Sequence, residues 1–416
     1  MNGLEIKSPD FTRVIENDSL WTDLLSNRNL PPFSDEAVAF VSALSTSILA
    51  LEQIREQPEL VALAFWLRRS NIQKMIADYN RDSKQNVYPL ARGVVLHIAP
   101  SNVDTIFVYS WILSLLCGNR NILRVPSRST PQVNILLGCI NGVLSKTEFR
   151  EIRDRVSFLR YEASEDATSI LSNQVDMRII WGGDETVNRI RRIPIPPTAL
   201  DISFANKWSL SVINYEHWVQ LPPNQKLELA RSFALDAFQF GQAACSSPRC
   251  VVWLNENNLH LDVESFWGNV TEVLSTVPFD FSAVDFVNKL VESDLLAQEK
   301  LTMKVVTSDN RITRLAIEAD HLHKIVESIH QCDAGFFFEC STNTLEGMFL
   351  KLDRKLQTVA SAGVSSERWR ELFEREQLQC FDRIVPIGSA LDFSPTWDGF
   401  QLFNEFLRFV HIAPMK

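Results

Sequence analysis

Short apolar runs alternate with segments of helical periodicity through the first half of the chain, and this alternation constrains the fold most. Apolar runs predict buried strands at residues 93–100, 121–125, 155–160 and 177–183. Between and after them, helical patterns occupy residues 102–117, 131–144, 164–171 and 185–192. Strands that alternate with helices of this length are typical of βαβ units, whose parallel sheet is covered on both faces.

Further elements are expected on both sides of this region. Ser34 is placed to cap a helix over 37–51, and apolar residues recur at helical spacing from 60 to 79. After the alternation, the pattern predicts a strand over 210–214, a helix over 223–238 that begins with a proline, and a strand over 251–254. The segment 383–412 predicts a strand, a turn, a helix and a last strand.

Composition and charge exclude several classes of protein. The chain has 416 residues, of which 45% are hydrophobic, and this length allows two or three domains of ~150 residues each. A net charge of -10 argues against nucleic acid as a partner. The seven cysteines form no C-x-x-C pair, so we expect no metal site. The beginning of the chain lacks a signal-peptide pattern, and the most apolar run, 106–117, is too short to span a bilayer. We expect a cytoplasmic protein without a membrane span.

One short segment, from Phe238 to Arg249, holds the best candidate for covalent chemistry. A helical run ends near Gly241, and Cys245 follows among small residues that let a substrate carbonyl approach. A thiolate is a strong nucleophile at neutral pH and accepts acyl groups as thioesters. A free cysteine more commonly serves as a small core residue, and we expect that role for the other six.

Three predicted strands end in residues that suit a phosphate-bearing ligand. In an open parallel sheet, ligands bind at the carboxyl ends of the strands, beside helix N-termini. The candidates are Pro100, Ser101, Asn102, Arg124, Ser127, Arg128, Gly182, Gly183 and Asp184. The dinucleotide fingerprint G-x-G-x-x-G is absent. Simpler roles stay open, since the glycine pair can be a plain turn, Asn102 a helix cap and Arg124 a surface charge. His97, among aliphatic residues, is expected to be a hydrogen-bonded core histidine.

In this order, the segments resemble the aldehyde dehydrogenase superfamily. They are more closely similar to the acyl-CoA and acyl-protein thioester reductase family, which includes the fatty-acid reductase of bacterial luminescence. The resemblance covers about residues 93–412 and rests on the segments 241–248, 181–184, 382–388 and 397–399. It implies an α/β fold with a Rossmann-like parallel-sheet cofactor domain and a smaller α/β catalytic domain. The expected parts are an N-terminal helical segment packed on the cofactor domain (1–80), the NADP-binding domain (81–215), the catalytic domain (216–385) and a C-terminal segment that returns to the cofactor domain (386–416).

The resemblance also implies roles for single residues. Cys245 matches the nucleophile, and Asn102 matches the asparagine whose amide donates to the developing oxyanion. Arg124 stands where the family has a lysine for the adenosine ribose, and Ser127 stands where NAD-using relatives carry a glutamate.

The cofactor expected from this pattern is NADPH. Without the glutamate, nothing at Ser127 repels a 2′-phosphate, and Arg124 and Arg128 could pair with one. Gly183 and Asp184 match the strand–helix turn beside the pyrophosphate. Gly182, Pro100 and Ser101 complete the expected cofactor site.

One departure from the superfamily bears on the reaction. Hydrolytic aldehyde dehydrogenases carry a glutamate four positions before the equivalent of Lys207, and this chain has Ser203 there. We expect Asp201, the nearest carboxylate, to face the other side if the segment is a strand. The missing base predicts reduction of an acyl thioester to an aldehyde.

The partners expected from the family are an acyl group on CoA, on a carrier protein or on an acyl-protein synthetase, and further copies of the chain in a homo-oligomer. Two alternatives remain. One is an NAD(P)-dependent aldehyde dehydrogenase that oxidises its substrate, and the other is a non-catalytic partner of an acyl-protein synthetase.

Overall fold

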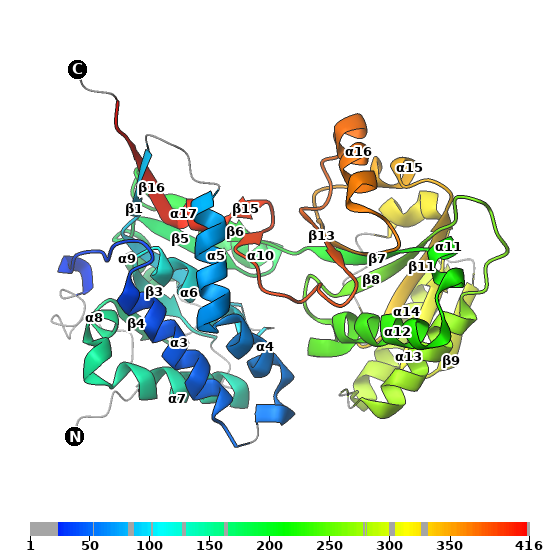
Figure 1. Cartoon of the computed structure of the whole chain (residues 1–416), viewed down its shortest axis with the longest axis horizontal. Coiled ribbons are helices and arrows are strands. Elements are labelled where there is room, and N and C mark those ends of the chain that lie inside the picture. Colours follow the sequence, from blue (N-terminus) through cyan, green and yellow to red (C-terminus); the bar gives the residue numbers. More distant parts are fainter. Residues whose placement is uncertain are drawn as a thin grey trace. The chain divides into compact units, whose positions relative to one another are not determined.

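The computed structural model describes residues 24–413, except for 53, 82–86, 101–102, 127–129, 162–164, 278, 280, 299–303 and 326–331. Contacts within the chain divide it into two compact units. Unit 1 holds the residues up to Ala205 and again from Phe393 onward, and unit 2 holds Asn206–Asp392. Each unit contains its own mainly parallel sheet (Figure 1). The four-part division expected from the sequence stays a prediction.

The main sheet of unit 1 is parallel, and among the described residues it has five strands in the order β4-β3-β2-β5-β6. These strands are β2 (Val94–Ile98), β3 (Arg120–Arg124), β4 (Val156–Leu159), β5 (Met177–Trp181) and β6 (Leu200–Phe204). Every residue of β2 and β5 is buried, as expected of strands that are covered on both faces. The chain adds β3 and β4 on one side of β2, and then β5 and β6 on the other. The strand order therefore reverses between β2 and β5.

Helices cover this sheet, and unit 1 combines residues from two stretches of the chain, up to Ala205 and from Phe393 onward. The helices are α3 (Asp35–Leu49), α4 (Pro58–Trp66), α5 (Arg69–Arg81), α6 (Ile106–Leu116), α7 (Pro131–Leu144), α8 (Arg150–Arg153), α9 (Glu165–Ser172), α10 (Asp184–Arg191) and α17 (Leu402–Phe406). Short antiparallel pairs join β1 (Val87–Ala91) to β16 (Leu407–His411), and β14 (Thr396–Trp397) to β15 (Phe400–Gln401). The predicted cap of α3 is confirmed, since the Ser34 hydroxyl accepts the Ala37 N–H at 3.3 Å.

Two predicted helices of unit 1 have different bounds. The apolar pattern over 60–79 forms two helices, α4 and α5, because the chain breaks between them at Leu67 and Arg68. The Asn71 side chain stabilises this break by donating to the Trp66 carbonyl at 2.7 Å. The helix expected from residue 102 begins instead at Ile106, after a turn at 104–105.

Unit 2 is built on a larger sheet, which among the described residues has the order β13-β12-β7-β8-β11-β10-β9. Its strands are β7 (Trp208–Asn214), β8 (Pro248–Leu254), β9 (Lys304–Asp309), β10 (Ile312–Ala316), β11 (Phe336–Thr342), β12 (Leu356–Ala362) and β13 (Arg383–Pro386). All neighbouring pairs are parallel except β9 with β10. The helices are α11 (Tyr215–Gln220), α12 (Pro223–Phe238), α13 (Glu264–Thr276), α14 (Ala283–Gln298), α15 (Glu346–Phe349) and α16 (Ser366–Glu376).

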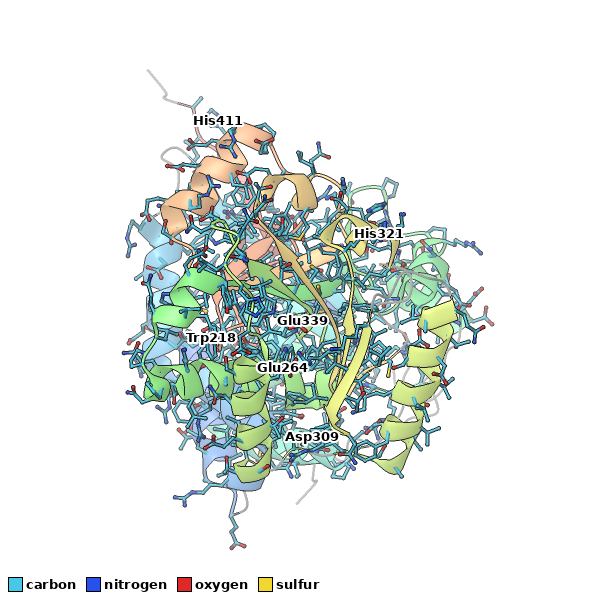
Figure 2. The ribbon with its side chains drawn as sticks, turned by 90° about the vertical axis from the view of Figure 1, so that its right-hand side faces the viewer. Trp218, Glu264, Asp309, His321, Glu339 and His411 are labelled. Atoms are coloured by element: carbon cyan, nitrogen blue, oxygen red, sulfur yellow. The ribbon has the colours of Figure 1, made fainter. Side chains whose placement is uncertain are left out.

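A buried charge network fixes α13 to this sheet. Glu339 of β11 accepts the indole N–H groups of Trp253 and Trp267, at 2.9 and 2.7 Å. Its carboxylate also pairs with Arg314 of β10 at 3.1 Å, and Arg314 in turn pairs with Glu264 at the start of α13 at 2.8 Å. Figure 2 shows Glu264 and Glu339 close together in this view. Because the buried charges of Arg314 and Glu339 are paired, and Arg314 also reaches the exposed Glu264, the network serves packing and ties β10, β11 and α13 together.

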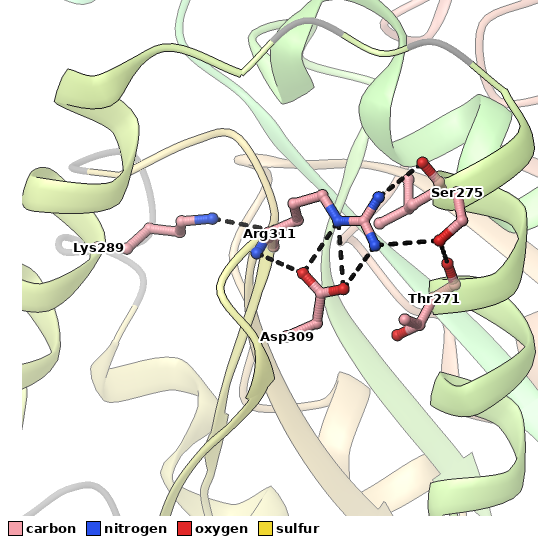
Figure 3. A network of polar contacts seen from close by, with 6 residues as sticks. Thr271, Ser275, Lys289, Asp309 and Arg311 are labelled. Carbon is pink, nitrogen blue, oxygen red and sulfur yellow. Dashed lines mark hydrogen bonds and ion pairs between the residues drawn. The ribbon is translucent and has the colours of Figure 1, made fainter.

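A second polar network fixes the turn between β9 and β10. Arg311 pairs with Asp309 at 2.6 Å and donates to the Leu274 carbonyl at 2.7 Å. Lys289 of α14 donates to the Arg311 carbonyl at 2.9 Å, and Ser275 of α13 lies on the other side (Figure 3). Both α13 and α14 are thereby tied to the outer hairpin of the sheet.

Candidate active site

A left-handed turn leads from α12 to Cys245. Phe240, Gly241 and Gln242 all have positive φ, at 58°, 58° and 66°. Two of these three residues are not glycine, and such backbone is strained unless its surroundings hold it. The fully buried Gln242 side chain supplies that support, since its amide donates to the carbonyls of Pro248 and Phe336 at 2.9 and 3.2 Å. The turn thus delivers the following residues to the amino ends of β8 and β11.

The backbone at Cys245 is held by the strand next to it. Ser209, the second residue of β7, donates its hydroxyl to the Cys245 carbonyl at 2.7 Å. The same hydroxyl accepts the N–H of Thr358 in β12 at 3.1 Å. One serine therefore links Cys245 to two central strands of the sheet.

The Cys245 sulfur lies against the side chain of Gln357 in β12. The distance from the Gln357 amide nitrogen Nε2 to Sγ is 3.2 Å, and the amide donates. Gln357 is only 1% exposed, whereas Cys245 is half-buried. The thiol therefore has a buried donor on one side and remains accessible to a substrate.

An ion pair closes this amino edge of the sheet. Lys207, just before β7, pairs with Asp382, just before β13, and both side chains are largely buried. The strand β12 lies between β7 and β13. Its first residues are also fixed by backbone bonds, from Trp208 N–H to the Lys355 carbonyl at 3.0 Å and from Asp382 N–H to the Gln357 carbonyl at 2.9 Å. The residue beside the thiol thus has little freedom to move.

The other cysteines differ from Cys245 as predicted. All six are buried, and Cys245 is not. Burial raises the pKa of Cys332 and of Cys380 to about 12, and raises those of Cys117 and Cys250 well above the ordinary value. A buried neutral thiol is a poor nucleophile. The prediction that these six are packing residues is confirmed.

In unit 1, the structure brings together the described candidates for cofactor binding. Pro100 follows β2, Arg124 ends β3, and Gly182 follows β5, so all three lie at the carboxyl edge of one sheet. Gly183 is the N-cap of α10, and Asp184 is its first residue. The order reverses between β2 and β5, which is where ligands bind in sheets of this kind. Ser101, Asn102, Ser127 and Arg128 lie outside the described residues.

Three arginines gather at this edge, and only Arg124 was singled out from the sequence. Its guanidinium lies 4.9 Å from the centroid of the Tyr161 ring, and burial, reinforced by the like charge of Arg189, lowers its pKa. Arg160 follows β4, whose last residue pairs with Arg124. Among the described residues, Nε and Nη2 of Arg160 are buried without a hydrogen-bond partner. Buried donors of this kind would be satisfied by an anion, which fits a phosphate group.

Two nearby polar residues serve the core of unit 1. His97 bonds to Ser110 at 2.8 Å and to Asn121 at 3.0 Å, and burial lowers its pKa to about 4, so the prediction of a core histidine is confirmed. The expected orientation of Asp201 was wrong. Residues 201 and 203 are two apart on β6 and share a face. Asp201 is instead held in an ion pair with buried Arg178 at 2.6 Å.

Within the described ranges, no group of three or more histidine, cysteine, aspartate or glutamate side chains is arranged to hold a metal ion. In the same part of the chain, no helix is both long enough and apolar enough to cross a bilayer.

Comparison with known proteins gives a family and a fold. The sequence model of the family described as acyl-CoA reductase (LuxC) matches residues 62–409. No curated protein sequence matches the chain.

Solved structures of aldehyde dehydrogenases share the fold. Aldehyde dehydrogenase 21 from Physcomitrella patens, in complex with succinate, has a TM-score of 0.67 at 9% identity, over 95% of this chain and 89% of that one. Glyceraldehyde-3-phosphate dehydrogenase GapN from Methanocaldococcus jannaschii, complexed with NADP, has a TM-score of 0.63 at 11% identity, over 97% of this chain and 93% of that one. An NAD-dependent benzaldehyde dehydrogenase from Corynebacterium glutamicum has a TM-score of 0.60 at 13% identity, over 96% of this chain and 89% of that one. The predicted α/β fold, aldehyde dehydrogenase-like with a Rossmann-like sheet, is confirmed.

Proposed function

The chain belongs to the acyl-CoA reductase (LuxC) family, and from this premise we propose that it reduces a fatty-acyl thioester to an aldehyde with NADPH. In this reaction Cys245 carries the acyl group. The observation that supports this most is the half-buried thiol of Cys245, held by Ser209 and Gln357 at the amino edge of unit 2.

Cys245 acts twice in this scheme. Its sulfur attacks the carbonyl carbon of the incoming thioester, the new C–Sγ bond forms, and the donor sulfur leaves with its electron pair and takes up a proton. A bound nicotinamide supplies the hydride that reduces this acyl group. The thiohemiacetal on Cys245 then collapses, the carbonyl re-forms, and the electron pair of the C–Sγ bond returns to sulfur. Asn102 is proposed to donate its amide to the oxyanion.

The acyl-enzyme can be tested without the cofactor. Incubation with an acyl-CoA and no nicotinamide should add one acyl mass to the peptide that contains Cys245. Cys245→Ala should abolish this label, and the buried Cys250→Ala should retain it. A label on any other thiol, or one that persists in Cys245→Ala, would show that the nucleophile is misassigned. If the wild type takes no label at all, a non-catalytic role as partner of an acyl-protein synthetase is favoured.

The carboxyl edge of unit 1 is proposed to hold NADPH. Gly182, Gly183 and Asp184 lie at a strand–helix turn suited to the pyrophosphate, with Pro100 across the point of strand reversal. Ser101 is proposed for the same site from the sequence alone. Arg124 is proposed to reach the ribose side. Ser127 and Arg128 remain candidates for the 2′-phosphate from the sequence alone.

The arginines at this edge support the choice of NADPH over NADH. A 2′-phosphate would accept the buried N–H groups of Arg160, beside Arg124 and the charge of Arg189. A dinucleotide without that phosphate would leave these donors unsatisfied.

The acyl donor and the cellular compartment are also proposed. The acyl donor would be CoA, a carrier protein or an acyl-protein synthetase, and the seven free thiols suit the reducing cytoplasm.

The outer face of α14 exposes five large apolar side chains next to the edge strand β9, and we propose that a second copy of the chain covers it. The exposed residues are Val284, Val287, Leu290, Val291 and Leu295. Val287→Asp should lower the molar mass measured by light scattering, and an unchanged mass would contradict the proposal.

A further inference from the structure

The contact between Gln357 and Cys245 joins two residues far apart in the sequence. The amide nitrogen of Gln357 lies 3.2 Å from Sγ, across a separation of 112 residues. A side-chain amide is uncharged at every pH that the protein meets, and its N–H is a donor only. The hydrogen bond therefore favours the form of the sulfur that accepts best, the thiolate.

The geometry fixes both partners of this bond. Gln357 is the second residue of β12, which is paired on both sides, with β7 and with β13. The Thr358 hydroxyl lies 3.4 Å from the Gln357 oxygen Oε1, which leaves the nitrogen end of the amide facing the sulfur. Ser209 holds the Cys245 carbonyl and the Thr358 N–H at once. The donor and the thiol thus belong to one rigid edge.

We propose that Gln357 is a catalytic residue whose amide stabilises the thiolate of Cys245, an inference that rests on the function proposed above. The donor acts at two points. Before attack it raises the fraction of Cys245 present as thiolate. When the C–Sγ bond of the thiohemiacetal breaks, the electron pair returns to the same sulfur, and the amide stabilises the leaving thiolate. In the acyl-enzyme between these points the sulfur is neutral and accepts poorly, so the bond is strongest where charge develops.

A second glutamine provides a matched control. Gln242 lies three residues before Cys245 and is likewise fully buried. Its amide donates to the carbonyls of Pro248 and Phe336, and its oxygen accepts the N–H groups of Gly335 and Phe336 at 2.8 and 3.2 Å. Its four bonds are to backbone, which is a purely structural role. Loss of Gln242 should lower stability without the specific effect on the thiol that loss of Gln357 should have.

The test measures the thiol itself. The rate of alkylation of Cys245 by iodoacetamide, followed by mass spectrometry of its peptide, is recorded against pH for the wild type, Gln357→Met, Gln357→Asn and Gln242→Met. Methionine keeps the length of the side chain without the donor, and asparagine keeps the amide but is one methylene too short to reach. A lost hydrogen bond to a charged group should raise the pKa of Cys245 by about one unit or more. The limiting rate at high pH should rise about threefold, because a more basic thiolate is more nucleophilic.

The outcomes separate the two proposals. A raised pKa in the Gln357 variants but not in Gln242→Met supports the inference, and either Gln357 variant suffices if the other does not fold. An unchanged pKa in a folded Gln357 variant, or an equal rise in Gln242→Met, overturns it. Alkylation needs no acyl substrate, so failure of the wild type to take an acyl label would overturn the proposed function while this measurement still decides the role of Gln357.

Discussion

The two parallel sheets carry their candidate residues at opposite ends of their strands. In unit 1, Pro100, Arg124 and Gly182 lie at the carboxyl ends of β2, β3 and β5. In unit 2, Cys245 meets Ser209 and Gln357 at the amino ends of β7 and β12. The first edge offers helix N-termini and cationic side chains, which suit phosphate, whereas the second offers a thiol and neutral donors, which suit acyl chemistry. In this chain, the candidate binding residues therefore lie at the carboxyl ends of strands, and the candidate nucleophile lies at the amino ends.

The largest effect is expected at the amino edge of unit 2. Cys245→Ser should lower turnover by about three orders of magnitude or more, because a hydroxyl without an adjacent base is a poor nucleophile. Steady-state aldehyde formation measures this, with Cys250→Ala as the control that should keep its activity. Substantial turnover in Cys245→Ser would show that the chemical step does not take place at this edge.

A smaller effect is expected at the carboxyl edge of unit 1. Arg160→Ala should weaken NADPH binding about tenfold while it leaves NADH binding nearly unchanged, because one charge-assisted contact is worth about 1.5–3 kcal/mol. Dissociation constants from nucleotide fluorescence measure this directly. Arg191→Ala, on the exposed end of α10, is the control. Equal binding of NADPH and NADH by the wild type would contradict the proposed phosphate contact.

The last effect concerns the stability of unit 2 and not its activity, and it depends on a buried carboxylate that serves structure. Asp236 of α12 accepts the N–H groups of Gly388 and Ala390, just after β13, at 2.6 and 3.0 Å. Burial raises its pKa from 3.8 to about 7. Because the folded state holds this proton more tightly than the unfolded state, Asp236 lowers stability as pH rises from about 4 through 7.

Asp236→Asn removes this titration along with an acceptor. The variant should be less stable than the wild type at pH 5. The difference in free energy of unfolding between the two proteins should narrow by on the order of 2–3 kcal/mol by pH 8, because the wild type loses stability as the pH rises. Urea unfolding at the two pH values measures this difference. A difference that widens with pH would contradict the assignment.

The sequence predicted the elements of unit 1 better than the contacts between distant strands. Buried strands such as β2 and β5 are continuous apolar runs, and the βαβ rule then places Pro100 and Gly182 at one edge. Arg160 was missed because its place beside Arg124 depends on the pairing of β3 with β4.

The partner of the nucleophile could not be found in the same way. Gln357 meets Cys245 through the parallel pairing of β7 with β12, and no local pattern encodes that register. The one available signal was a long polar side chain near the start of a strand whose other residues are apolar or carry a short hydroxyl side chain. The left-handed turn at 240–242 was also hidden, because two of its three residues are not glycine.

The central claim is that the acyl group on Cys245 is reduced by hydride transfer and is not hydrolysed by water. Ser203 stands where hydrolytic relatives are expected to carry a glutamate, and a positioned base typically contributes about 10²–10⁴-fold to rate. The most direct test is the ratio of free acid to aldehyde released in a single turnover of acyl-loaded enzyme mixed with NADPH. The wild type should yield almost only aldehyde, and Ser203→Glu should release acid even without cofactor. Mostly acid from the wild type would contradict the account and favour an aldehyde-oxidising enzyme.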